Sequence, residues 1–267
     1  MRRPVRRLPR AAPAEVATFS GPRAMAREAG AIRFLRAPGW LPRGRRVYAV
    51  GDIHGQRDSL AALHGIIAED MARRPVGSSV IVYLGDFINQ GPDSAGVLDL
   101  VAGGPPVAGM RVVGLMGDHE RMLLDALAGD RPSATDFLWS GGRATLAGWG
   151  IDPDLPGAAW AAGIPAAHLA WLRSLRLTHR EGGYLFVHAG IRPGVPAADQ
   201  AREDLVSMRQ PFLSSEQDFG AVVVHGHSSA PSVHIGENRI GLDTGAGIGG
   251  RLSCAVLEDD VIGLCAA

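Results

Sequence analysis

The sequence predicts an α/β fold, with parallel strands in its first half and further strands in its second half. Three short apolar runs each end in a Gly-Asp pair, at residues 51–52, 85–86 and 117–118, and a helical pattern follows each pair. Strand, loop and helix that alternate in this way are typical of parallel strands joined by right-handed crossovers. With 267 residues, 46% of them hydrophobic, the chain is long enough for one large domain with a real core.

The first half is expected to contain three strands and three helices. The strands are short runs of apolar residues, at positions 47–50, 80–84 and 112–115. The helices show apolar residues at helical spacing or follow a strand directly, at positions 58–73, 94–101 and 119–127. Polar residues cluster after each strand. Open α/β sheets place their ligand sites at this end of the strands.

The second half is richer in strands. They are predicted at positions 184–187, 221–224 and 239–242, and as a terminal hairpin at 252–257 and 261–265. Between the two halves, residues 132–175 are predicted to be helical and contain four tryptophans. A tryptophan-rich helical stretch is more often part of a core or a flap than a binding platform. Cys254 and Cys265 lack metal-ligand spacing and are expected to pack in strands as small hydrophobic residues.

Residues 1–42 differ from the rest of the chain. The first 13 residues hold five arginines and three prolines and show no periodicity. We therefore expect a flexible tail, followed by one domain over residues 43–267. No apolar run approaches the length of a transmembrane helix, and no signal peptide is evident, so we expect a cytoplasmic protein without a membrane partner. The balance of 27 basic and 27 acidic residues gives no electrostatic reason to expect nucleic acid as a partner.

Carboxylates and imidazoles follow five of the predicted strands. These residues are Asp52 with His54, Asp86, Asp118 with His119, His188, and His225 with His227. One such pair could be a helix cap, but five strand ends of this kind are hard to explain as caps. Side chains of these types, converging from separate strands, suit a pair of divalent ions. Two such ions can activate a hydroxide and stabilise an in-line displacement at phosphorus, so the pattern predicts a two-metal hydrolase.

The same segments resemble the motifs of a known family. Residues 51–55, GDIHG, resemble the GDxHG motif of calcineurin-like phosphoesterases. Residues 85–91, GDFINQG, and 117–120, GDHE, resemble the GDxxDRG and GNHE motifs of its phosphoprotein phosphatase branch, and HAG at 188–190 and GHS at 226–228 resemble its later motifs. The resemblance covers positions 47–257 and is closest to bacterial serine/threonine protein phosphatase-like members. It implies a β-sandwich of mixed sheets flanked by helices.

The resemblance also implies roles for individual residues. One divalent ion would be held by Asp52, His54 and Asp86, and a second by Asp86, Asp118, His188 and His227. Asp86 would bridge the two ions, His119 would be the general acid and Arg209 would bind the phosphate. Manganese is the metal expected first, with iron and zinc as alternatives. The implied reaction is hydrolysis of a phosphate ester, in a phosphorylated protein or a small phosphoester or nucleotide, by a hydroxide held between the metals. His225 is expected to be structural or to support a ligand.

Four residues depart from the family pattern, and all belong to the predicted site. Asn89 replaces an aspartate that orients the catalytic histidine, and its amide oxygen is expected to accept a hydrogen bond from His119. Gln90 replaces an arginine that clamps phosphate, and Met116 stands where a second arginine is usual. Asp118 replaces a neutral asparagine. The pocket is therefore more negative than in the family, which favours diesters or nucleotide anhydrides over the dianion of a phosphomonoester.

Three functions remain open from the sequence. The first is an active phosphoesterase, either protein-phosphatase-like or a nucleotide-anhydride hydrolase resembling diadenosine tetraphosphate hydrolases. The second is a weakened phosphatase homologue that binds metal and a phosphorylated partner. The third is a non-enzymatic scaffold whose arginine-rich tail is the working part. All six ligand positions keep side chains that can bind metal, which argues against complete loss of the site.

Overall fold

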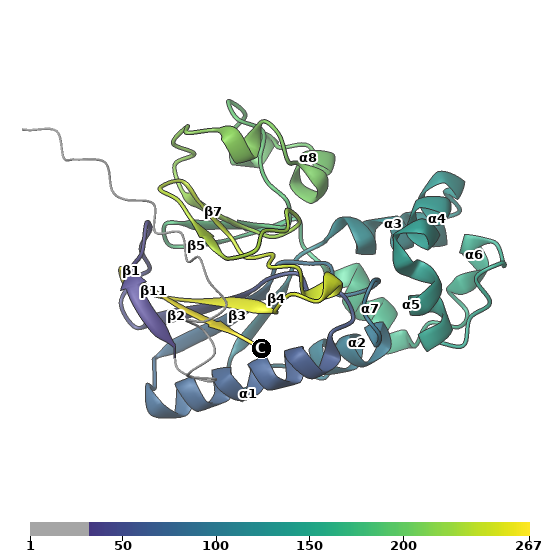
Figure 1. Cartoon of the computed structure of the whole chain (residues 1–267), viewed down its shortest axis with the longest axis horizontal. Coiled ribbons are helices and arrows are strands. Elements are labelled where there is room, and N and C mark those ends of the chain that lie inside the picture. Colours follow the sequence, from purple (N-terminus) through teal and green to yellow (C-terminus); the bar gives the residue numbers. More distant parts are fainter. Residues whose placement is uncertain (1–31) are drawn as a thin grey trace, which may run out of the picture.

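Two mixed β-sheets pack face to face at the centre of the molecule (Figure 1). The computed structural model describes residues 32–267. Within them, the first sheet has six strands in the order β1-β11-β10-β2-β3-β4, and the second has five in the order β5-β6-β7-β9-β8. Helices lie outside both sheets (Figure 1). The predicted sandwich of mixed sheets flanked by helices is therefore confirmed.

The first sheet contains the three parallel strands that the Gly-Asp pairs predicted. These are β2 (Arg45–Val50), β3 (Ser78–Tyr83) and β4 (Arg111–Gly114). Val50 lies beside Tyr83, and Tyr83 beside Gly114, so the three strands end at one edge of the sheet. The predicted hairpin is also present, as antiparallel strands β10 (Ser253–Glu258) and β11 (Val261–Ala266), with β10 paired to β2.

Side chains alternate between the two faces of the first sheet. In β3, Ile81 and Tyr83 belong to a core cluster on the helical side, while Val80 and Val82 belong to the core between the sheets. The helical side is covered by α1 (Arg57–Arg73) and α2 (Ser94–Ala102), which run below the sheet in Figure 1. Because each strand is buried on both faces, it appears in the sequence as a continuous apolar run.

The second sheet is smaller and is likewise packed on both faces. Its strands are β5 (Thr178–Glu181), β6 (Tyr184–Val187), β7 (Val222–His225), β8 (His234–Ile235) and β9 (Arg239–Gly241). Strands β6, β7 and β9 are parallel, so they too end at a common edge. The outer face packs on α8 (Arg202–Ser207) and a short 3₁₀ turn, Phe212–Ser214. Two further 3₁₀ turns cover Ala197–Asp199 and Ala246–Ile248.

A helical region connects the two sheets, as predicted for residues 132–175. After α3 (Asp118–Leu127) it contains α4 (Arg131–Phe137), a π-helical turn (Leu138–Gly142), α5 (Arg143–Gly148), α6 (Gly157–Trp160) and α7 (Ala166–Ser174). Trp160 is 1% exposed and belongs to the core, whereas Trp139, on the π-helical turn, is 87% exposed. Of the two predicted roles, Trp160 has the core role, and Trp139 lies outside the core.

The domain begins earlier than residue 43, which corrects the predicted boundary. Residues Arg33–Arg36 form β1, which pairs with the hairpin strand β11 at the edge of the first sheet. These residues pair with the free edge of the hairpin through backbone hydrogen bonds. Because the pairing does not depend on their side chains, the sequence pattern did not predict it. The remainder of the predicted tail, residues 1–31, lies outside the described part. Within residues 32–267, no helix has the length and apolar character needed to cross a bilayer.

Candidate metal centre

The candidate site lies where the strands of both sheets end. Asp52 follows β2, Asp86 follows β3, and Asp118 follows β4 at the start of α3. From the second sheet, His188 follows β6 and His227 follows β7. Parallel strands place their carboxyl ends at one edge, and stacking two such edges brings carboxylates from one sheet to imidazoles from the other.

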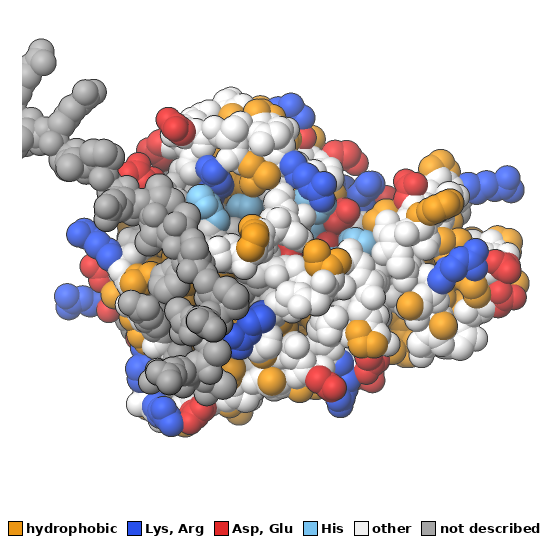
Figure 2. All heavy atoms as spheres, in the orientation of Figure 1, with side chains coloured by type: hydrophobic (Ala, Val, Ile, Leu, Met, Phe, Trp, Pro, Cys, Tyr) orange, Lys and Arg blue, Asp and Glu red, His pale blue; other side chains and the backbone are white. Residues whose placement is uncertain are grey.

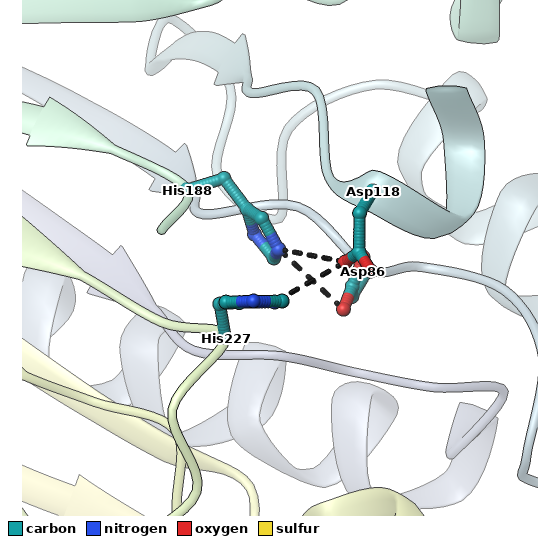
Figure 3. Close-up of side chains that lie close together, drawn as sticks. All are labelled: Asp86, Asp118, His188 and His227. Carbon is teal, nitrogen blue, oxygen red and sulfur yellow. Dashed lines mark hydrogen bonds and ion pairs between the residues drawn. The ribbon is translucent and has the colours of Figure 1, made fainter. Parts of the chain in front are cut away.

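Four of these side chains form one compact group (Figure 3). His188 Nε2 lies 3.3 Å from Asp118 Oδ1 and 3.5 Å from Asp86 Oδ2. His227 Nδ1 lies 3.3 Å from the same Asp118 oxygen. The four ligand atoms converge on one position, as Figure 3 shows for Asp86, Asp118, His188 and His227. This set contains the four residues predicted for the second metal.

A second group shares Asp86 with the first. It consists of His54, Asp86 and His119, with His54 Nε2 at 3.5 Å and His119 Nε2 at 4.0 Å from Asp86 Oδ2. Asp86 is therefore common to two neighbouring sets of potential ligands, which is the arrangement expected of a residue that bridges two ions. The second group differs from the predicted one, because it contains His119 in place of Asp52.

Two histidines are held in the orientation that a metal ligand needs. His188 Nδ1 donates to the carbonyl oxygen of Leu84 at 2.8 Å, and His54 Nδ1 donates to that of Ile88 at 3.1 Å. Because Nδ1 of each ring is engaged in this way, Nε2 is the nitrogen that faces Asp86 and would bind a cation. Hydrogen bonds of this kind from the second ring nitrogen are a regular feature of histidines that bind metal.

Asp52 lies apart from the second group but remains suited to bind a cation. Its Oδ2 accepts a hydrogen bond from the backbone N–H of His227 at 2.8 Å. Its Oδ1 is buried and has no hydrogen-bond partner among the described residues. A Cβ on Gly226 would lie 1.9 Å from this oxygen, so only glycine allows the close approach. A buried carboxylate oxygen without a donor is costly unless a ligand completes its coordination.

The electrostatics of the site also call for cations. Burial, together with the charges of Asp118 and Glu120, raises the pKa of Asp86 well above its usual value. Burial lowers the pKa of His188, but its hydrogen bond with Asp118 and the nearby carboxylates outweigh burial and raise that pKa to about 9. A proton on His188 Nε2 thus offsets the negative charge of Asp86 and Asp118. A bound metal ion would offset the same charge. The donor set of carboxylate and imidazole, without thiolate, fits divalent ions such as manganese, iron or zinc.

Backbone strain is concentrated at the same loops. Six non-glycine residues of the described part have positive φ, and five belong to the site: His54, Asp86, Asn89, Gln90 and His227. Non-glycine residues adopt this conformation at a cost, and such residues cluster at functional sites. Gly117 contributes differently, since a Cβ there would lie 2.1 Å from Asp86 Oδ1. The loops are therefore shaped to direct polar side chains inward.

The partner of His119 is oriented differently from our expectation. Asn89 does lie beside His119, but its amide nitrogen Nδ2, rather than its oxygen, lies 2.8 Å from His119 Nδ1. The amide oxygen accepts a hydrogen bond from the Thr145 hydroxyl at 2.8 Å. Thr145 lies in α5, 56 residues away in sequence, and belongs to none of the local motifs. Burial of His119 lowers its pKa to about 4, so the ring is neutral near pH 7.

The predicted substrate-binding residues line a cavity of about 150 Å³ at the site. Its wall includes Arg209 and Gln90, together with His54, Asp86, Asp118, His119, His227, Ser229, Asp243, Gly245, Gly247 and Ile248. Histidine and acidic side chains reach the surface here beside arginine side chains (Figure 2). Arg209 and Gln90 are exposed, so each can meet a ligand from solvent. Met116 is buried and does not line the cavity.

Glu120 supports the site, although no role was predicted for it from its place in the GDHE segment. Its carboxylate is fully buried and accepts backbone N–H groups of Asp86 at 2.9 Å, Phe87 at 2.8 Å and Gly117 at 3.1 Å. It also accepts from Ile88 at 3.3 Å. Glu120 thereby holds the loops that carry Asp86 and Asp118. Its place in the GDHE segment was a signal that it belongs with the ligands.

Asp243 is a second residue that was not assigned. It follows β9 as the other carboxylates follow their strands, it lines the cavity, and it accepts hydrogen bonds from Ser229 and from the backbone of Gly245. His225, by contrast, is buried and belongs to neither ligand group. Its ring packs edge-on against Phe212, with 5.0 Å between the ring centroids, which is consistent with the structural role expected for it.

Known proteins resemble the chain over the same region. The Salmonella typhimurium serine/threonine-protein phosphatase 1 is 27% identical over 240 residues, which cover 84% of this chain and 95% of that protein. Symmetrical bis(5′-nucleosyl)-tetraphosphatases are similar over shorter stretches. That of Methylococcus capsulatus is 30% identical over 152 residues, covering 55% of this chain and 44% of that protein. The chain thus spans about half the length of the tetraphosphatases it matches.

Solved structures agree with the sequence relatives. A structure provisionally assigned as a diadenosine tetraphosphatase has a TM-score of 0.60 and 26% identity, covering 83% of this chain and 93% of that one. The cold-active protein-tyrosine phosphatase of a psychrophilic Shewanella shares the fold, with a TM-score of 0.57 and 18% identity over 83% of this chain and 79% of that one. The calcineurin-like phosphoesterase profile matches residues 45–255. From the match over this span, the chain belongs to the calcineurin-like phosphoesterase family.

Proposed function

We propose that this protein is a metal-dependent hydrolase of phosphate esters or anhydrides. The observation that carries the proposal is the position of Asp86, whose carboxylate is shared by two neighbouring groups of potential metal ligands. The residues proposed to hold two divalent ions are Asp52, His54, Asp86, Asp118, His188 and His227. When bound, two such ions supply an activated water and offset the charge of the phosphoryl oxygens. Manganese is the first expectation for the metal, and iron and zinc are the alternatives.

The chain's own residues bind and orient the substrate. Arg209 is proposed to hold phosphoryl oxygens, since its guanidinium lines the cavity and is open to solvent. Gln90 provides a neutral amide at the same wall. His119 also lines the cavity, with Nε2 4.0 Å from Asp86 Oδ2, and is proposed to contact the oxygen that leaves phosphorus. Glu120 is proposed to fix the loops that carry the ligands, and Asn89 to orient the imidazole ring of His119.

Two substrate classes are consistent with the family. The match to a protein phosphatase over nearly its whole length favours a phosphorylated protein or a small phosphomonoester. The tetraphosphatases and the uncharged Asn89–His119 pair favour a nucleotide anhydride. A cytoplasmic location stays a prediction from the sequence.

The proposal is tested by measuring metal content and turnover in one preparation. We expect manganese-dependent hydrolysis of p-nitrophenyl phosphate, bis-p-nitrophenyl phosphate or a dinucleoside tetraphosphate, and no turnover after chelation. Two ions per chain by elemental analysis would accompany activity. Absence of turnover on all three substrates, in protein that contains both ions, would refute the hydrolase and leave the weakened homologue that binds metal and a phosphorylated partner.

Replacement of Arg209 is expected to weaken substrate binding. Arg209→Ala should lower kcat/KM by roughly 10–10²-fold, because one donor to the phosphoryl group is lost at a site open to water. Arg209→Lys should recover part of this loss, since it keeps the charge without the planar pair of donors. Arg202→Ala is the matched control, because Arg202 is a solvent-exposed arginine of α8 that does not line the cavity. Equal kinetics for the Arg209 and Arg202 variants would exclude this role.

A further inference from the structure

The two cysteines of the chain face each other across the terminal hairpin. Cys254 lies in β10 and Cys265 in β11, and they are direct partners in the antiparallel pairing of these strands. Residues directly opposite each other in an antiparallel pair project from the same face of the sheet. Both cysteines accordingly belong to the core cluster on the helical side, and both are free thiols.

The spacing of the two strands at this position suits a disulfide. Leu252 and Ala267 exchange both of their backbone hydrogen bonds, each at 3.0 Å. Pairs of this kind recur at every second position along an antiparallel ladder, so Cys254 and Cys265 form the next one, with Cα atoms about 5.5 Å apart. Disulfides join Cα atoms that are roughly 4.4–6.8 Å apart. A bond between the two sulfurs is therefore compatible with the strands as they stand.

The two thiols differ in their access to solvent. Cys254 is completely buried, whereas Cys265 is 8% exposed. Burial, together with a hydrogen bond to the Cys265 thiol, raises the pKa of the Cys254 thiol. A thiol with a raised pKa is rarely ionised and reacts slowly with oxidants, because the thiolate is the nucleophile. Cys265 is therefore the thiol that would meet a small oxidant first, with Cys254 behind it as the resolving partner.

We propose that Cys254 and Cys265 are a site of reversible oxidation, at which a cross-strand disulfide ties β11 to β10. With hydrogen peroxide as the oxidant, the Cys265 sulfur attacks a peroxide oxygen, the O–O bond breaks, and one water leaves a sulfenic acid behind. The Cys254 sulfur then attacks the Cys265 sulfur, so that an S–S bond forms, the S–O bond breaks and a second water leaves. The two thiols have then lost two protons and two electrons, which the peroxide has gained. A dithiol such as dithiothreitol reverses the change.

The bond would lie close to the loop that carries Asp52. Strand β10 lies between β11 and β2, and Cys254 is the register partner of Val50, the last residue of β2. The next residue, Gly51, donates its backbone N–H to the carbonyl oxygen of Ser253 at 3.0 Å. A covalent link between β10 and β11 would therefore strengthen the part of the sheet that supports this loop. The inference does not depend on the proposed function, since it involves no metal, substrate or turnover.

Thiol counting on the full chain tests whether the disulfide forms. The protein is treated with hydrogen peroxide under native conditions, unfolded, alkylated and analysed by mass spectrometry. We expect a monomer without free thiols, a peptide pair that links Cys254 to Cys265, and recovery of both thiols with dithiothreitol. Cys254→Ala and Cys265→Ala, which lack the partner, should instead give sulfinic acid or a disulfide-linked dimer. Wild-type protein that retains both thiols, or that reacts like the single variants, would overturn the inference.

Thermal unfolding tests whether the native strands accommodate the bond. The oxidised wild type should have a Tm higher than that of the reduced form by roughly 5–10 °C, because the disulfide closes a loop in the unfolded chain. Cys254→Ala is the control for peroxide damage elsewhere, and its Tm should not rise after the same treatment. A Tm of the oxidised wild type equal to or below that of the reduced form would show that the disulfide does not fit the folded hairpin, and the inference would be wrong.

Discussion

Asp86→Asn is expected to remove bound metal and lower turnover by roughly 10³-fold, the equivalent of several kcal/mol of lost transition-state stabilisation. The Asp86 carboxylate lies 3.5 Å from both His54 Nε2 and His188 Nε2, and it is the member common to both groups of potential ligands. An amide has nearly the same shape but no charge, so the variant keeps the packing and loses the bridge. Elemental analysis and p-nitrophenyl phosphate or dinucleoside tetraphosphate turnover are the measurements.

The control for this change is Asp260→Asn, at an exposed position in the turn between β10 and β11. It makes the same chemical substitution far from the site, so metal content and turnover should match the wild type. If Asp86→Asn retained two ions and full activity, Asp86 would not bridge the metals, and the proposed ligand assignment would have to be abandoned.

Glu120→Ala is expected to destabilise the fold by about 3 kcal/mol or more. The carboxylate accepts four backbone N–H groups of the site loops, which would be left buried without partners at roughly 1–3 kcal/mol each before water relieves some of them. For a domain of this size, that loss corresponds to a fall of roughly 6–12 °C in Tm. Thermal unfolding followed by circular dichroism measures it.

Chelator separates the two consequences expected of this variant. In the presence of EDTA, the Tm difference reports the loops alone, and in excess manganese it also includes lost metal binding. Glu120→Gln keeps one acceptor oxygen, so its Tm should fall between the wild type and Glu120→Ala. An unchanged Tm for Glu120→Ala in both conditions would show that the loops do not depend on Glu120.

The strands that carry the ligands could be predicted because each is buried on both faces. Apolar runs at β2, β3 and β6 stand out in the sequence. The first charged or imidazole residue after each run is a ligand candidate, by the rule that parallel sheets bind at their carboxyl ends. This rule places Asp86 and His188 without knowledge of the pairing. It also applies to Asp243, which follows β9 and lines the cavity.

Features set by distant contacts could not be predicted in this way. Strand β1 is defined by its pairing with β11, at the opposite end of the chain. The orientation of the Asn89 amide depends on the hydroxyl of Thr145, 56 residues further along the chain. Asp52 is drawn toward the backbone of His227 rather than into the group of His54 and Asp86, because loop geometry, and not spacing, decides which oxygen meets which N–H.

The division of ligands between the two sheets links metal binding to the assembly of the whole domain. Asp86 and Asp118 project from the first sheet, and His188 and His227 from the second, so neither half of the chain alone holds the complete four-residue group. An ion bound there would cross-link the two sheets. The complete four-residue group forms only when both sheets have packed together. Metal affinity therefore depends on how accurately the two sheets pack against each other. Substitutions at Val82 or Phe186, which lie in the core between the sheets, should lower metal affinity although neither residue is a ligand.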